Sequence, residues 1–121
     1  MATLSIRIDL APDIRIGPGK VRLLELIAET GSISGAGRAL AMSYRRAWLL
    51  VDEMNRTLAS PVVAAKPGGR SGGGAALTPF GERIVACYRQ IEREASALAL
   101  RHLEESGVAK DSLDETAKTP Q

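Results

Sequence analysis

The chain has 121 residues, of which 45% are hydrophobic, only 3% are aromatic and one, Cys87, is a cysteine. This length predicts one domain with a short tail, and a single cysteine excludes an internal disulfide. We expect an aliphatic core, to which Cys87 contributes as a small buried hydrophobe. No segment is typical of a secretion signal or approaches the ~20 apolar residues of a membrane span. The expectation is a soluble, cytoplasmic protein with no membrane partner.

The net charge of +2 is unevenly distributed along the chain. Residues 30–81 contain six basic and two acidic residues, a net charge of +4, which leaves −2 for the rest. A basic central segment is typical of proteins that bind the phosphate backbone of nucleic acid. Because four excess charges are few, solvated surface charge is an alternative explanation.

The N-terminal segment predicts a strand followed by a loop. Residues 3–10 alternate apolar and polar, which indicates a half-buried strand whose inner face carries Leu4, Ile6, Ile8 and Leu10. Residues 11–20 contain two prolines and two glycines and therefore predict a loop. Within it, Ile14 and Ile16 either extend the strand briefly or hold the loop against the core.

Two helices are predicted next, over residues 20–29 and 33–40. Gly31 is placed to end the first helix and Ser32 to cap the second. The first helix is expected to face inward with Val21, Leu23, Leu24, Ile27 and Ala28. Gly35 and Gly37 each weaken the second helix by ~1 kcal/mol relative to alanine. They are candidates for a close crossing with the helix that follows.

The segment Ser43–Leu58 predicts a longer amphipathic helix with Ser43 as its N-cap. Its apolar face would carry Tyr44, Ala47, Trp48, Leu50, Val51, Met54 and Leu58, and we expect Trp48 in the core. The opposite face would carry Arg45, Arg46, Leu49, Asp52, Glu53 and Arg56. The helix dipole disfavours two arginines in a first turn, so this placement indicates an anionic partner beyond the helix start. An ordinary core helix with solvated arginines is the alternative. Together with the preceding short helix, the pattern predicts a helix-turn-helix.

A glycine-rich hairpin is predicted after this helix. The β-prone run V-V-A-A-K and the run A-A-L-T flank P-G-G-R-S-G-G-G, so that the hairpin carries Lys66 and Arg70. A phosphate-binding loop is excluded, because no Lys-Ser/Thr pair opens a helix after the last glycine. A flexible linker is the remaining alternative. A basic hairpin directly after a helix-turn-helix is typical of a DNA-binding wing.

The final helix is predicted from about Phe80 to Glu105, with Thr78 as cap and proline at the first helical position. Its apolar residues recur at steps close to a heptad, through Ile84, Tyr88, Ile91, Ala95, Leu98 and His102. About 25 residues would extend ~38 Å, past the core of so small a domain. We interpret it as a dimerisation helix with Ile84, Tyr88, Ile91, Ala95 and Leu98 at the interface; a helix folded wholly onto its own domain is the alternative.

Residues 1–105 would form the domain and residues 106–121 a disordered tail.

Catalytic and metal-binding chemistry finds little support in the sequence. His102 is the single histidine, and no cysteine or second histidine lies at ligand spacing from it. Adjacent carboxylates such as Asp52 and Glu53 lie on faces expected to be solvated. We predict a protein that is not an enzyme and that uses no cofactor and no metal.

Several of these motifs together resemble one known family. They are Ser32-Ile33-Ser34, S-Y-R-R-A-W from Ser43 with Met54-Asn55, the glycine run ending in Gly72-Gly73-Gly74-Ala75, and Leu77-Thr78-Pro79-Phe80-Gly81. Over roughly residues 4–105 the chain resembles the DNA-binding domain of the molybdate-responsive regulators, the ModE family. The L-T-P-F-G piece alone is less specific, since LysR-type regulators carry similar strings.

The resemblance implies a mainly α fold with a small β component, a winged helix-turn-helix that dimerises through its long C-terminal helix. It also implies a homodimer that regulates transcription by binding a palindromic operator in double-stranded DNA. The residues then expected to contact DNA are Ser32, Ser34, Ser43, Tyr44, Arg45, Arg46, Leu49, Arg56, Lys66 and Arg70. Family members bind molybdate in a separate C-terminal region with no counterpart here, so molybdate binding by this chain is not expected.

Two other classes of function remain open at this stage. A winged-helix dimer of the same fold would serve as a protein-interaction module if its wing and helix bound a protein instead of DNA. A small-molecule sensor with a pocket at the dimer interface is less favoured, because the sequence offers no convergent polar cluster. Steep salt dependence of binding would favour DNA over a protein partner.

Overall fold

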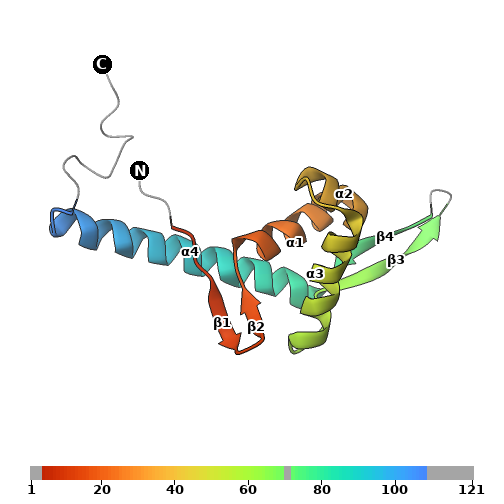
Figure 1. The fold of residues 1–121 in the computed structure, drawn as a ribbon, viewed down its shortest axis with the longest axis horizontal. Coiled ribbons are helices and arrows are strands. Elements are labelled where there is room, and N and C mark those ends of the chain that lie inside the picture. The colour runs from red at the N-terminus through yellow and green to blue at the C-terminus, as the bar shows by residue number, and fades with distance from the viewer. Residues whose placement is uncertain (1–3, 70–71, 109–121) are drawn as a thin grey trace, which may run out of the picture.

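The computed structural model describes residues 4–69 and 72–108. Its elements are β1 (Ile8–Ala11), β2 (Ile14–Ile16), α1 (Pro18–Thr30), α2 (Ile33–Ala39), α3 (Tyr44–Thr57), β3 (Val63–Gly69), β4 (Gly72–Leu77) and α4 (Pro79–Glu105). In Figure 1, α1, α2 and α3 cluster at one end of α4, and the β3–β4 hairpin projects beyond that end. The predicted fold is confirmed: a mainly α, winged helix-turn-helix with a long C-terminal helix.

The first three helices lie close to their predicted bounds, although α1 begins at Pro18, two residues earlier than expected and inside the predicted loop. Gly31 ends α1 with a left-handed φ of 79°, and its N–H donates to the Ile27 carbonyl. The Ser32 hydroxyl accepts from the Gly35 amide at 2.8 Å and so caps α2. Ser43 caps α3 in the same way, accepting from the Arg46 amide at 3.1 Å. Local capping chemistry therefore sets the two helices of the helix-turn-helix in place.

The N-terminal segment differs from the predicted strand and loop. The strand begins at Ile8 instead of residue 3, and Ile14–Ile16, expected within a loop, forms the second strand of an antiparallel hairpin. The register shifts between Asp9 and Ala11, which interrupts the alternation of faces. Leu10 lies at this irregularity and is 56% exposed, so its predicted place on the buried face is wrong.

The core is aliphatic, as predicted, and lies between α1, α3, α4 and the base of the wing. Its fully buried large side chains are Leu23, Leu24, Ile27, Val21 and Val62. Ala28, predicted to face inward, is exposed, while Leu26 is buried. Val21 packs with Ile16 and Tyr88 in a second, smaller cluster. Ala28 lies two turns after Val21 on the same side of α1, beyond this cluster, and is therefore exposed.

Close approach between the two helices of the helix-turn-helix depends on Gly37. A Cβ at this position would lie 3.3 Å from Ala47 Cβ and 3.4 Å from the Met42 carbonyl oxygen, so α3 crosses α2 at a point where there is little room for a side chain. The close crossing proposed for Gly37 is therefore confirmed. The space beside Gly35 is filled instead by Ser32 and Thr30, within its own capping turn.

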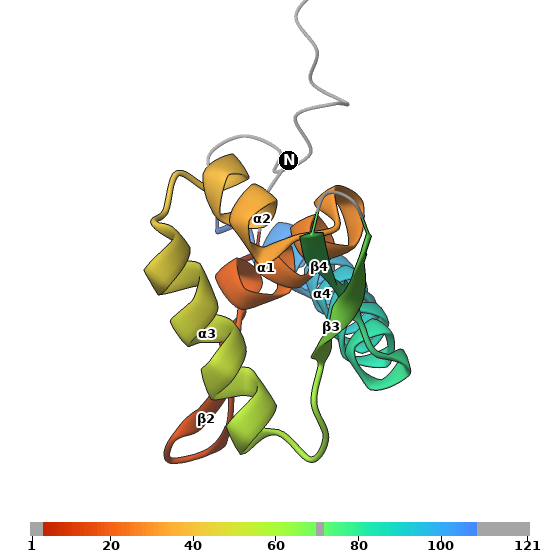
Figure 2. The same cartoon turned by 90° about the vertical axis from the view of Figure 1, so that its right-hand side faces the viewer.

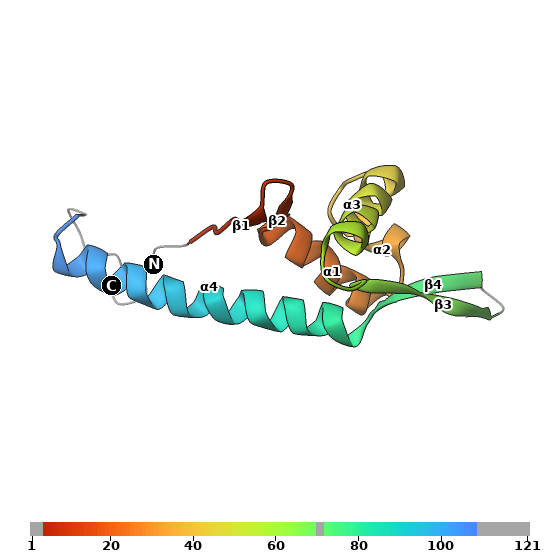
Figure 3. The same cartoon turned by 90° about the horizontal axis from the view of Figure 1, so that it is seen from below.

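The helix α4 runs almost the length of the molecule, and its C-terminal half extends past the β1–β2 hairpin (Figure 3). Thr78 caps it, accepting from the Gly81 amide at 2.9 Å. Tyr88 is 2% exposed and donates from its hydroxyl to the Ile6 carbonyl at 2.6 Å, which ties the N-terminal segment to α4. Tyr88 is thus part of its own core, and its predicted place at a dimer interface is wrong.

Two further features of α4 concern its exposed side. Cys87, predicted to be buried, is exposed, because Tyr88 and not Cys87 faces α1 and β2. The side chains of Ile91 and Leu98 are 39% and 47% exposed.

Neither α4 nor any other helix within residues 4–69 and 72–108 is long and apolar enough to cross a membrane.

Candidate nucleic-acid interface

The exposed side of α3 forms the centre of the candidate interface. Ala47, Val51 and Met54 bury one side of this helix against the core. The opposite side presents Arg45, Leu49 and Arg56 to solvent, with Leu49 45% exposed. Figure 2 places α3 and the β3–β4 hairpin side by side at the same end of the molecule, with α4 behind the hairpin. An elongated ligand therefore has access to the helix and the wing together.

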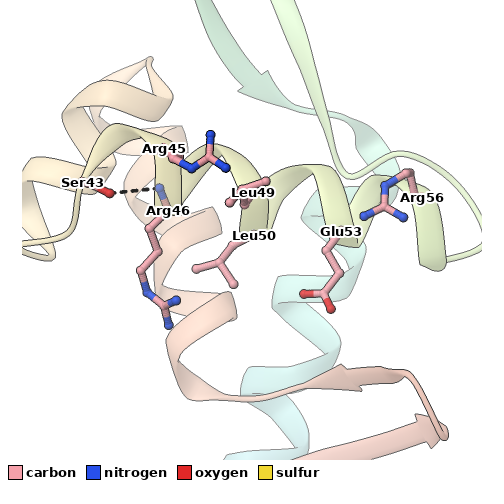
Figure 4. Close-up of a pocket in the computed structure, with 7 residues that line it drawn as sticks. All are labelled: Ser43, Arg45, Arg46, Leu49, Leu50, Glu53 and Arg56. Atoms are coloured by element: carbon pink, nitrogen blue, oxygen red, sulfur yellow. Dashed lines mark hydrogen bonds between the residues drawn. The ribbon is translucent and has the colours of Figure 1, made fainter.

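A shallow depression of about 380 Å³ runs along α3 (Figure 4). It is lined by Ser43, Arg45, Arg46, Leu49, Leu50, Glu53 and Arg56. The two carboxylates of the helix are already engaged: Asp52 accepts from Arg56 at 2.8 Å, and Glu53 lies 3.2 Å from the Lys20 ammonium. Arg45 and Arg46 extend in different directions from the first turn, and these two guanidinium groups give the start of α3 its positive charge.

The remaining predicted contacts lie around this surface. Ser32 and Ser34 are half-buried at the start of α2, where Ser32 is the cap and the Ser34 hydroxyl accepts from Arg38 at 2.9 Å. Both hydroxyls keep a hydrogen to donate after accepting these bonds. Lys66 is exposed on β3. Arg70 lies outside the described residues.

Two aromatic side chains of α3 are exposed, and one of them, Tyr44, was also among the residues expected to contact DNA. Tyr44 is 58% exposed and Trp48 is 45% exposed, although both were assigned to the apolar face of the helix. The prediction that Trp48 is a core residue is wrong. The buried side of α3 is narrow, because Gly37 brings α2 close at Ala47, and the flank that faces the wing is open.

Asn55 holds the wing to α3, a role that the sequence did not assign. Its Oδ1 accepts from the Val62 and Val63 amides at 2.8 and 3.2 Å, and its Nδ2 donates to the Val63 carbonyl at 3.1 Å. One side chain thus satisfies three backbone groups at the point where β3 leaves the core. The available signal was an asparagine inside a helix, where this residue is disfavoured unless its amide has a partner.

Other ligand chemistry finds no support at this surface. Within residues 4–69 and 72–108, no three His, Cys, Asp or Glu side chains are grouped as a metal site would require. What the surface offers is cationic side chains, hydroxyl donors and exposed apolar groups along a helix and a hairpin. These are the groups with which proteins contact phosphates and base edges in duplex DNA.

Comparison with known proteins identifies the fold as that of a regulatory family. The family described as bacterial regulatory helix-turn-helix protein, lysR family, matches residues 19–82, slightly more than half of the chain. The chain belongs to this family. The match begins in α1 and ends in the first turn of α4, so it includes the helix-turn-helix and the wing. The printed description of the family, a regulatory helix-turn-helix protein, agrees with the helix-turn-helix that α2 and α3 form.

Individual relatives confirm the resemblance to ModE. The molybdenum-pterin-binding protein MopB of Rhodobacter capsulatus is 51% identical over 84 residues, covering 69% of this chain and 31% of MopB. The transcriptional regulator ModE of Haemophilus influenzae is 36% identical over 108 residues, covering 89% of the chain and 42% of that protein. The DNA-binding transcriptional dual regulator ModE of Escherichia coli is 34% identical over 97 residues, covering 78% and 37%. The chain thus spans less than half the length of these relatives.

Proposed function

We propose that this lysR-family, ModE-like chain acts as a homodimer that reads a palindromic operator in double-stranded DNA. The observation that carries the proposal is the arrangement at α3, where Arg45, Arg46 and Leu49 are exposed beside a wing that carries Lys66. In a dimer related by a two-fold axis, the two α3 helices would enter successive major grooves about one helical turn apart, ~34 Å.

The residues of the surface divide by the kind of contact they suit. The guanidinium groups of Arg45 and Arg46 can form paired hydrogen bonds with the N7 and O6 of guanine, and Leu49 offers an apolar contact for a thymine methyl group. Ser32, Ser34 and Ser43 suit phosphate oxygens, which position the protein without reading sequence. Arg56 at the far end of α3 and Lys66 on the wing would bind the DNA strands that pass there.

The link to molybdenum metabolism is part of this proposal and is supported by the names of the relatives. ModE of Azotobacter vinelandii, 47% identical over 75 residues, is described as a molybdenum transport protein. The matched segment is the helix-turn-helix portion of these proteins, so the inference concerns which genes are regulated. Binding of molybdate by the residues of this chain is not proposed.

Selection of bound duplexes from a randomised DNA library, run with and without molybdate, tests the proposal. We expect an enriched palindrome with half-sites one helical turn apart, unchanged by molybdate. A folded protein that enriches no sequence would contradict the proposal and favour the protein-interaction module. An enriched sequence without two-fold symmetry would contradict the homodimeric reading while preserving DNA binding.

Substitutions then separate sequence reading from backbone binding. Arg45→Ala or Arg46→Ala should relax base preference within each half-site, at about 1–3 kcal/mol per lost base contact. Lys66→Ala should weaken binding to all duplexes to a similar degree and reduce the slope of log K against log salt by about one. Arg93→Ala, an exposed arginine on α4, serves as the matched control. Unchanged binding and preference in all three test variants would refute this docking arrangement.

A further inference from the structure

The wing-facing flank of α3 carries an exposed aromatic pair. Tyr44 and Trp48 are four residues apart, so they lie one above the other on the same side of the helix. Trp48 lines a groove of about 220 Å³ between α3 and β3, together with Asn55, Val63 and Ala64. Large aromatic side chains left in water lose the benefit of burial, so their exposure at a binding surface favours a partner that covers them.

The groove lies where one DNA strand would pass. With α3 in the major groove and the β3–β4 hairpin at the adjacent minor groove, the strand between the two grooves crosses the gap between helix and hairpin. Trp48 lines this gap, and the elements on its two sides, α3 and β3, carry the exposed residues Arg45 and Lys66. The flanking cations suit a polyanionic strand, and the apolar floor suits the faces of its sugars.

Asp52 is the one acidic residue that lines the groove. Its carboxylate accepts from Arg56 at 2.8 Å, so its charge is compensated within the helix. Because Arg56 compensates the charge of Asp52, this carboxylate does not make the groove a binding site for a basic partner.

We propose that Tyr44 and Trp48 are DNA-backbone contacts, with the rings packed on deoxyribose and the indole N–H and phenol O–H donating to phosphate oxygens. This inference rests on the proposed function and adds to it, since it assigns Trp48 to binding and not to folding. Phosphate and sugar contacts position the protein without carrying sequence information. The pair therefore sets affinity and register, while Arg45, Arg46 and Leu49 read the bases.

Trp48 is the single tryptophan of the chain, so its own fluorescence reports on the contact. The duplex would be a fluorescein-labelled, mixed-sequence DNA at low salt, whose anisotropy measures binding independently of Trp48. We expect acrylamide quenching of Trp48 to fall several-fold in the complex, because DNA covers the indole. This measurement uses the unmodified protein and does not depend on the folding of any variant.

Variants then separate the ring from its N–H group. Trp48→Phe keeps an aromatic ring without the donor, and Tyr44→Phe removes only the hydroxyl. Each should weaken binding by about tenfold, as expected for a lost hydrogen bond to a charged group. The loss should be similar for operator and mixed-sequence duplexes. Leu10→Ala, an equally exposed apolar residue on the β1–β2 hairpin, is the matched control and should bind normally.

The possible outcomes distinguish this inference from the proposed function. The inference would be overturned if the protein binds the duplex by anisotropy while acrylamide quenching of Trp48 stays unchanged and Trp48→Phe and Tyr44→Phe bind with normal affinity. The proposed function would then remain intact. A change in base preference in either variant would overturn the assignment to the backbone. Absence of binding to any duplex would overturn both.

Discussion

Gly81 lies in the first turn of α4, where the helix begins against the strand that leads into the wing. A Cβ at this position would lie 2.2 Å from the Val62 carbonyl oxygen and 3.0 Å from its carbon. The same carbonyl accepts from the Thr78 amide at 3.0 Å, so it has little freedom to move away. One glycine thus allows the capping turn of α4 to rest directly on the backbone of the core.

Gly81→Ala should therefore destabilise the protein by about 3 kcal/mol or more, because backbone atoms must move to admit the methyl group. Gly19→Ala is the matched control, since Gly19 also lies in the first turn of a proline-started helix and nothing lies within 4 Å of its added Cβ. The control should leave stability unchanged or raise it by about 0.5–1 kcal/mol. Urea unfolding of both variants measures the difference. Equal stabilities would show that the backbone at Val62 adjusts freely.

At the scale of elements, the wing is attached to the rest of the molecule at two places. Asn55 on α3 bonds to the backbone of Val62 and Val63 at the start of β3. On the other strand, the Ala75 amide donates to the Gly31 carbonyl at 2.9 Å, between α1 and α2. The hairpin is therefore oriented by α3 and by the turn between α1 and α2. These bonds fix the position of the wing, which carries Lys66, relative to α3.

Asn55→Ala should lower the free energy of unfolding by about 2–3 kcal/mol, because three backbone groups lose their partner. The loss should be localised at the base of the wing. Hydrogen exchange at the Val62 and Val63 amides should accelerate much more than exchange at Val51, which lies in the middle of α3. Equal acceleration at all three amides would mean that Asn55 contributes only to global stability and does not orient the wing.

The elements were predictable from sequence to the extent that local chemistry determines them. Caps at Ser32 and Ser43 and the stop at Gly31 act within a few residues, so the helices were found close to their true ends. The face that each side chain presents depends on distant neighbours. The apolar pattern of α3 includes Trp48 and therefore predicted that it is buried. The close approach of α2 at Gly37, which the sequence pattern does not reveal, leaves a buried side too narrow to include Trp48.

The same limit applies to the N-terminus and to α4. A bulge at Leu10 changes which side faces inward, and no alternating pattern indicates it. A heptad-like pattern does not tell which of its apolar residues pack within the chain, as Tyr88 does, and which stay exposed, as Ile91 and Leu98 do. The DNA-contact roles given to the serines, Arg45, Arg46 and Lys66 remain predictions.

At the scale of the whole molecule, an ion pair joins α1 to α4. Arg89 donates to both carboxylate oxygens of Glu25 at 2.9 Å and to Glu92 at 2.7 Å. The hydrogen bonds from Arg89 hold the pKa of the Glu25 carboxyl below its ordinary value, against an opposing effect of partial burial. Because the folded pKa is depressed, this stabilisation is present above the unfolded pKa of glutamate and is lost as the pH falls through the folded pKa.

Glu25→Gln should therefore cost about 1.5 kcal/mol at neutral pH, typical of a hydrogen bond to a charged group. The difference from the unmodified protein should begin to shrink as the pH falls below the ordinary glutamate pKa of about 4.3, and should vanish below the depressed folded pKa, where Glu25 is protonated in both states. Urea unfolding at a series of pH values measures it. A difference that persists at low pH would assign the effect to packing and not to the charge.

Apolar side chains lie exposed along one side of α4. The helix has 27 residues, and Cys87, Ile91 and Leu98 lie exposed along one side of it. Seven residues separate Ile91 from Leu98, the spacing of a two-helix seam, so pairing of two α4 helices would cover both. This geometry supports the proposed homodimer.

Leu98→Glu should convert the dimer to a monomer, because a carboxylate at the seam meets its own copy in an apolar contact. Leu10→Glu, which changes a leucine of similar exposure on the β1–β2 hairpin, should remain dimeric. Sedimentation velocity at micromolar concentration measures both. The Leu98→Glu monomer should still bind a single half-site but lose most of its affinity for the palindrome, since the second contact no longer adds to the first. An unmodified protein that sediments as a monomer would refute the pairing of α4, as would a Leu98→Glu variant that stays dimeric.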